Sequence, residues 1–151
     1  MPLVSVVRLE PTFIAAVRHR TTFAALPREI RSYFDVVYAA VRDGAVKPSG
    51  HNVAIYRNAS EHGVDVECGV RVATKFADMG PIECRELPRG EAATTAHWGP
   101  YERLAEAHDR IAAWAAENGR ALAGVVWEIY GDWHDDPALV RTDVYHLLKP
   151  V

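Results

Sequence analysis

The same order of elements, strand, helix, strand, strand, occurs twice in this sequence of 151 residues, and it restricts the fold more than any other feature. Apolar residues recur at helical spacing over about 27–42 and again over about 100–118. Pro27 and Pro100 suit a first helical turn, and a glycine follows each segment, as a helix end requires. Strands are predicted from β-rich or alternating runs at 12–19, 52–57, 64–73, 91–98, 124–133 and 142–151.

The two halves also share letters. "AIYRN" at 54–58 corresponds to "EIYGD" at 128–132. We therefore predict an α+β fold with two related strand-helix-strand-strand (SHS2) modules, pseudo-twofold symmetry, and an antiparallel sheet with two main helices. A cleft where the halves meet is the expected binding site. The predicted single domain spans 1–151 and divides into module 1 at about 12–73, a linker strand at about 82–88, and module 2 at about 91–151.

Charge and composition exclude several classes of function. A net charge of -3 without a basic cluster gives no electrostatic reason to bind nucleic acid directly. No apolar run approaches the roughly 20 residues that span a bilayer, and the N-terminus does not resemble a signal peptide, so we expect no membrane association and a cytoplasmic location. The cysteines and histidines lack metal-ligand spacing, so we expect no metal site and no cofactor.

Glu128 is a carboxylate in an apolar, β-rich segment, within "WEIYGDW" at 127–133. The matching position in the first half is Ala54, so the fold does not require an acid there. Tyr130 shares the strand face of Glu128 and adds an aromatic ring with a polar tip. A carboxylate buried among aromatic rings is costly unless a partner offsets its charge. We predict a ligand pocket whose charged group is Glu128; a solvent-facing glutamate is the alternative.

These residues resemble a known family, the GyrI-like small-molecule-binding domain, which also forms the effector-binding half of AraC-type and MerR-type multidrug regulators. The resemblance rests on "HWGPYERL" at 97–104, Trp114 in the second helix, "EIY" at 128–130, and a last strand ending "LLKPV". It implies a tandem strand-helix-strand-strand fold. The sequence departs from the regulators in having no room for a helix-turn-helix and no basic region, so we expect the sensing domain to stand alone. The resemblance also implies a glutamate at the base of an aromatic pocket, which corresponds to Glu128 with Tyr130 beside it.

Three functions follow from this resemblance. The first is binding of hydrophobic, possibly cationic aromatic molecules. The second is hydrolysis of electrophilic, cyclopropane-bearing genotoxins, with Glu128 and Tyr130 as the catalytic groups. The third is a protein interaction that inhibits DNA gyrase or involves a regulator partner. The residues predicted to bind the ligand are Glu128, Tyr130, Tyr56, Trp98, Tyr101, Trp127, Tyr145 and Tyr33.

Other polar residues have structural interpretations. His97 lies where a strand ends before a turn, so we expect a hydrogen-bonding structural role. Trp114 and Phe34 lie on inner helix faces and are expected in the core. "HDD" at 134–136 and "SGHN" at 49–52 are predicted to be a solvated loop and a turn.

Overall fold

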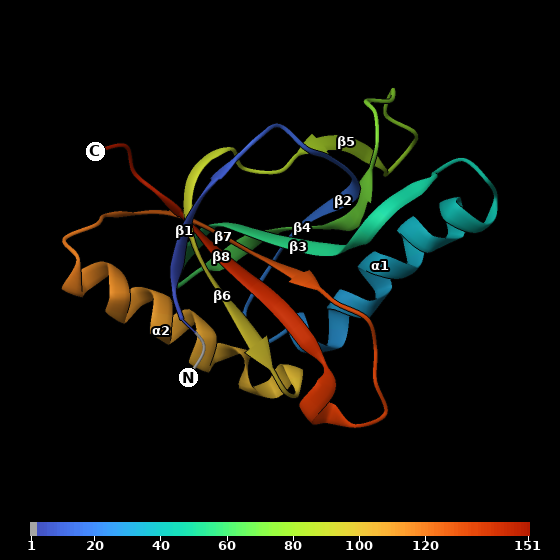
Figure 1. Ribbon diagram of the computed structural model, residues 1–151. Coiled ribbons are helices and arrows are strands. Elements are labelled where there is room, and N and C mark those ends of the chain that lie inside the picture. The colour runs from blue at the N-terminus through green and yellow to red at the C-terminus, as the bar shows by residue number, and fades with distance from the viewer. Residues whose placement is uncertain (1–2) are drawn as a thin grey trace. The chain divides into compact units, whose positions relative to one another are not determined.

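In the computed structural model, which describes residues 3–151, the chain forms two compact units (Figure 1). The N-terminal unit comprises residues 11–87, and the C-terminal unit comprises residues 3–10 and 88–151. The N-terminal unit contains β2 (Phe13–Thr21), α1 (Leu26–Arg42), β3 (Pro48–Ser60), β4 (Gly63–Val72) and β5 (Glu83–Glu86). The C-terminal unit contains β1 (Ser5–Leu9), β6 (Gly90–Trp98), α2 (Leu104–Glu117), β7 (Leu122–Tyr130) and β8 (Arg141–Leu148), with short 3₁₀ turns at Tyr101–Arg103 and Pro137–Leu139.

All strands in each unit pair antiparallel. The N-terminal unit has the order β3-β4-β2-β5, and the C-terminal unit has the order β1-β6-β8-β7. Each unit therefore contains strand, helix, strand, strand, and the predicted α+β fold with antiparallel strands and two main helices is confirmed. Each unit also has one added edge strand: β5, in the predicted linker, pairs with β2, and the unpredicted β1 pairs with β6.

Several boundaries differ from the sequence-based predictions: the strand expected to reach residue 133 ends at Tyr130, and the last strand ends at Leu148. The helix expected from residue 100 begins at Leu104, because Pro100 is extended and Gly99 has φ 137, a conformation that favours glycine. Residues 49–52, predicted as a turn, belong to β3, whose pairing register with β4 shifts between Pro48 and Asn52. Within residues 3–151 no helix has the length and hydrophobicity needed to cross a membrane.

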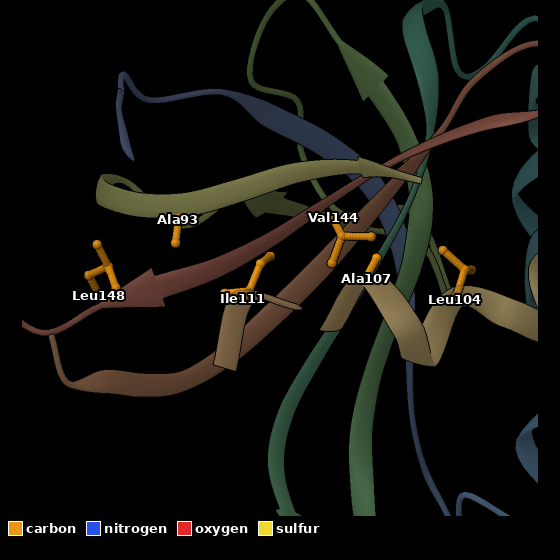
Figure 2. Packing of buried hydrophobic residues seen from close by; sticks show 6 residues of the cluster. All are labelled: Ala93, Leu104, Ala107, Ile111, Val144 and Leu148. Carbon is orange, nitrogen blue, oxygen red and sulfur yellow. The ribbon is translucent and has the colours of Figure 1, made fainter. Parts of the chain in front are cut away.

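The core of the C-terminal unit lies between α2 and its sheet (Figure 2). Leu104, Ala107 and Ile111 recur at three- and four-residue spacing on α2 and point toward the strands. On β8 every second residue is buried, so Val144 and Leu148 pack against this helix while their neighbours face the other way. Trp114 is partly buried against the same cluster, close to the predicted core position.

This packing determines which polar side chains meet. On β8 the buried face that carries Val144 also carries His146. On β7, Glu128 is paired with Val144 in the register and lies on the same face of the sheet. On α2, His108 follows Leu104 by four residues and lies one turn along the buried stripe. Helix and strands therefore bring three ionisable groups to one place beside an apolar core.

Removal of the Ile111 side chain tests the core. Ile111 is fully buried, so Ile111→Ala is expected to lower the free energy of unfolding by about 2–5 kcal/mol, measured by urea titration. Leu139→Ala removes as many carbon atoms from an exposed side chain of the same unit. It is expected to change the free energy of unfolding by less than about 0.5 kcal/mol. Equal effects of the two substitutions would contradict the assignment of Ile111 to the core.

Candidate functional site

Glu128 is a buried carboxylate on the α2 side of β7. The residue is 7% exposed, although strand neighbours such as Ile129 and Val126 are only partly buried. Burial of an ionised carboxylate is unfavourable unless hydrogen bonds or a positive charge replace its lost water. The contacts of its two oxygens therefore determine what this site can do.

Each oxygen of Glu128 has a hydrogen-bond partner. The Tyr130 hydroxyl donates to Oε1 at 2.6 Å, and Nε2 of His108 lies 2.7 Å from Oε2. The other ring nitrogen of His108, Nδ1, lies 2.8 Å from Nε2 of His146. Tyr130, Glu128, His108 and His146 thus form a hydrogen-bonded chain, here called the Glu128 chain, that joins β7, α2 and β8.

His146 is held uncharged in this chain. Burial lowers the pKa of its imidazole from 6.5 to about 4; the electrostatic interaction with His108 lowers this pKa further, while that with Glu128 opposes the change. A neutral His146 either accepts a hydrogen bond from Nδ1 of His108 or donates one to it. In both arrangements Nε2–H of His108 donates to the Glu128 carboxylate. Both ring nitrogens of His108 are therefore engaged within the chain.

Aromatic rings connect Tyr130 with the surface. The Tyr101 ring meets the Tyr130 ring edge-on, with centroids 5.7 Å apart, and the Trp133 ring lies 6.4 Å from that of Tyr101. Tyr101 is 41% exposed and Trp133 is 68% exposed. This aromatic series, Trp133, Tyr101 and Tyr130, ends at the buried carboxylate of Glu128.

Three other aromatic residues of the predicted site are placed differently in the C-terminal unit. Trp127 precedes Glu128 on the strand and lies on the opposite face of the sheet, where its ring stacks on Tyr145 at 5.2 Å and 3°. Trp98 is exposed at the end of β6, with the Arg141 guanidinium 5.4 Å above its ring. These three rings therefore differ from Tyr130, whose hydroxyl donates a hydrogen bond to Glu128.

The remaining two predicted residues, Tyr33 and Tyr56, belong to the N-terminal unit. Tyr33 on α1 stacks on His19 with ring centroids 4.0 Å apart, and its hydroxyl donates to Glu29 at 2.7 Å. Burial, and next the bond to Glu29, raise the pKa of Tyr33 above its ordinary value. Tyr56 of β3 is partly buried and lies opposite Val66 of β4.

Sequence reasoning missed His108, His146 and Trp133 as members of the site. The available signals were weak: His108 continues the apolar spacing of α2, and His146 alternates with buried residues of β8. Both positions therefore appeared to be core. The structural role expected for His97 agrees with its geometry, because its Nε2 lies 3.0 Å from the Pro100 carbonyl oxygen. Among residues 3–151, no group of three or more His, Cys, Asp or Glu side chains is arranged to hold a metal ion.

Comparison with known proteins identifies the family. The family model of the GyrI-like small-molecule-binding domain matches residues 3–149, nearly the whole chain. The chain belongs to this family. The GyrI-like fold accounts for the two strand-helix-strand-strand units, and the family description agrees with the resemblance noted in the motifs. Among proteins with curated functions, none matches this GyrI-like domain significantly in sequence.

Solved structures of similar fold have diverse descriptions. The C-terminal domain of EcmrR superposes with a TM-score of 0.83 at 19% identity, covering 100% of this chain and 99% of that one. SAV2435 bound to tetraphenylphosphonium has a TM-score of 0.72 at 10% identity, and the superposition covers 97% of this chain and 94% of SAV2435. A hydrolase from Listeria innocua has a TM-score of 0.63 at 10% identity, and the superposition covers 97% of this chain and 91% of the hydrolase. At these identities the likeness shows the shared fold.

The low pKa of His146 predicts a loss of stability in acid. As the pH falls from 6.5, the unfolded chain protonates this histidine, whereas the folded protein does so only near pH 4. The unfolded state thus binds more protons in this window, and the free energy of unfolding should fall on the order of 2–3 kcal/mol from this group. We expect urea titrations between pH 7.5 and 4 to show that the free energy of unfolding falls less steeply with pH in His146→Asn than in the wild type.

The exposed His134 provides the control for this measurement. His134→Asn is expected to retain the pH dependence of the wild type, because that side chain lies in an exposed loop. Identical slopes for wild type and His146→Asn would show that His146 does not resist protonation in the folded protein.

Proposed function

We propose that this GyrI-like domain binds hydrophobic aromatic cations at Glu128, with the rings of Tyr130, Tyr101 and Trp133 as the wall of the site. The observation that carries this proposal is a buried carboxylate at the inner end of an aromatic series that begins at the surface. The carboxylate attracts positive charge, and each aromatic face adds a cation–π attraction of about 0.5–2 kcal/mol.

The partners of Glu128 favour ligands that carry charge without hydrogen-bond donors. Tyr130 and His108 already donate to the two carboxylate oxygens. A cation with shielded charge can approach the rings and the carboxylate without displacing these donors. SAV2435, which shares the fold, was solved with tetraphenylphosphonium, a cation of this type. This supports the choice of ligand class and of the first probe.

Tetraphenylphosphonium binding tests this proposal. Glu128→Gln removes the negative charge while preserving side-chain size, and it is expected to weaken binding by roughly 2–5 kcal/mol in calorimetry. Glu117→Gln, an exposed substitution at the end of α2, removes the same charge from the same unit and is expected to leave the affinity nearly unchanged. Equal affinities for wild type and Glu128→Gln would show that this carboxylate is not the recognition group.

The Glu128 chain favours hydrolysis of an electrophilic ligand as a second candidate function. In such a reaction the oxygen of water bonds to the electrophilic carbon, and a carbon–carbon bond of a strained ring breaks. Glu128, hydrogen-bonded to His108, would accept the water proton, and the Tyr130 hydroxyl would donate a proton to the departing carbon. The hydrolase from Listeria innocua shares this fold, which supports testing for turnover.

Incubation with a cyclopropane-bearing alkylating compound distinguishes catalysis from binding. A hydrolase should yield the ring-opened, hydrated product over many turnovers, detected by mass spectrometry. Glu128→Gln should lower the rate about a hundredfold or more, and Tyr130→Phe should lower the rate while keeping the aromatic wall. Recovery of only unaltered compound, in amounts that match bound protein, would support the binding function alone. Inhibition of gyrase stays a prediction of the family resemblance.

A further inference from the structure

A second group of charged side chains lies in the N-terminal unit, on the sheet face away from α1. His19 of β2 faces α1, because it stacks on Tyr33 of that helix. Its neighbour Arg18 therefore faces the other way, and it lies opposite Glu67 of β4 in the register. Glu67 is only 2% exposed, so this face contains a carboxylate that is even more buried than Glu128.

Two arginines share the Glu67 carboxylate. Nε of Arg57 donates to Oε2 at 2.7 Å, and Nε of Arg85 donates to Oε1 at 2.8 Å. Two guanidinium groups are thus held beside each other by a single negative charge, with one positive charge in surplus. Within residues 3–151 the terminal Nη groups of Arg57 and Arg85 have no hydrogen-bond partner, and both side chains are partly exposed.

Arg57 and Arg85 line a pocket of about 490 Å³. This volume lies within the roughly 300–1,000 Å³ typical of small-molecule sites. Two further arginines line the pocket, but each already has a carboxylate partner: Arg18 bonds to Glu83 through two nitrogens, and Arg20 bonds to Asp65. The surplus positive charge of the pocket is therefore located at Arg57 and Arg85.

We propose that this pocket binds the phosphate group of a small molecule between the terminal nitrogens of Arg57 and Arg85. Each guanidinium offers a planar pair of N–H donors, which matches two oxygens of an anion. A phosphate has enough oxygens to accept a pair of N–H donors from each guanidinium group, whereas the two oxygens of a carboxylate can match the pair of one guanidinium or, as in Glu67, take a single bond from each of two. The buried Glu67 holds both arginines in place, so little side-chain freedom is lost on binding. This site is independent of Glu128 and of the proposed cation ligand.

Titration with inorganic phosphate, followed by ¹H–¹⁵N NMR at constant ionic strength, tests this inference. Saturable shifts are expected in the backbone amides around Glu67 and Arg85 and in the Nε–H signals of Arg57 and Arg85. Chloride at the same ionic strength should not produce them. No saturable shift at phosphate concentrations up to about 20 mM, or shifts spread evenly over the surface, would overturn the proposal.

Lysine substitutions separate recognition by the guanidinium from simple charge. Arg57→Lys and Arg85→Lys keep the positive charge near Glu67 but remove the planar pair of donors, and each is expected to weaken phosphate binding at least fivefold. Arg103→Lys, at an exposed arginine of the other unit that bonds to Glu106, serves as the matched control and should leave the affinity unchanged. Unchanged affinity in folded Arg57→Lys and Arg85→Lys would contradict the proposal. If either variant unfolds, the proposal is tested by the wild-type protein alone: saturable phosphate-dependent NMR shifts around Glu67, Arg57 and Arg85 would support it, and their absence would overturn it.

Discussion

The burial of the Glu128 carboxylate is the constraint on which the candidate site depends. An ionised carboxylate that loses its water must gain hydrogen bonds or a positive charge, and here the chain supplies hydrogen bonds from different elements. Tyr130 comes from the same strand, His108 comes from α2, and His146 supports His108 from β8. The apolar packing of α2 on the sheet brings these elements together, so the core and the polar chain stabilise the same arrangement.

The two units use one order of elements for different chemistry. In the C-terminal unit the "IY" strand carries Glu128 and faces a helix that supplies His108. In the N-terminal unit the matching position is Ala54, which is fully buried opposite Cys68 and provides no charge. The charged groups of that unit gather instead on the opposite face of its sheet, around Glu67. The same order of elements therefore carries different charged groups in the two halves.

The fold could be predicted from the sequence because its signals are local. Apolar spacing identified both helices, and alternating runs identified the paired strands in the correct order. The short β1, whose five residues are mostly exposed or partly buried, gave no such signal, since its pairing with β6 joins distant parts of the chain. Glu128 and Tyr130 could be singled out because an acid in an apolar strand is unusual. The contact between His108 and His146, which are 38 residues apart, depends on tertiary packing that no local pattern encodes.

The position of a bound cation tests the account most directly. Intermolecular nuclear Overhauser effects between the aromatic protons of tetraphenylphosphonium and the protein would locate the ligand on one face of the C-terminal sheet. If the cation binds at Glu128, we expect contacts to the rings of Tyr130 and Tyr101, on the face that carries Glu128. Contacts confined to Trp127 and Tyr145, the stacked pair on the opposite face, would contradict the account.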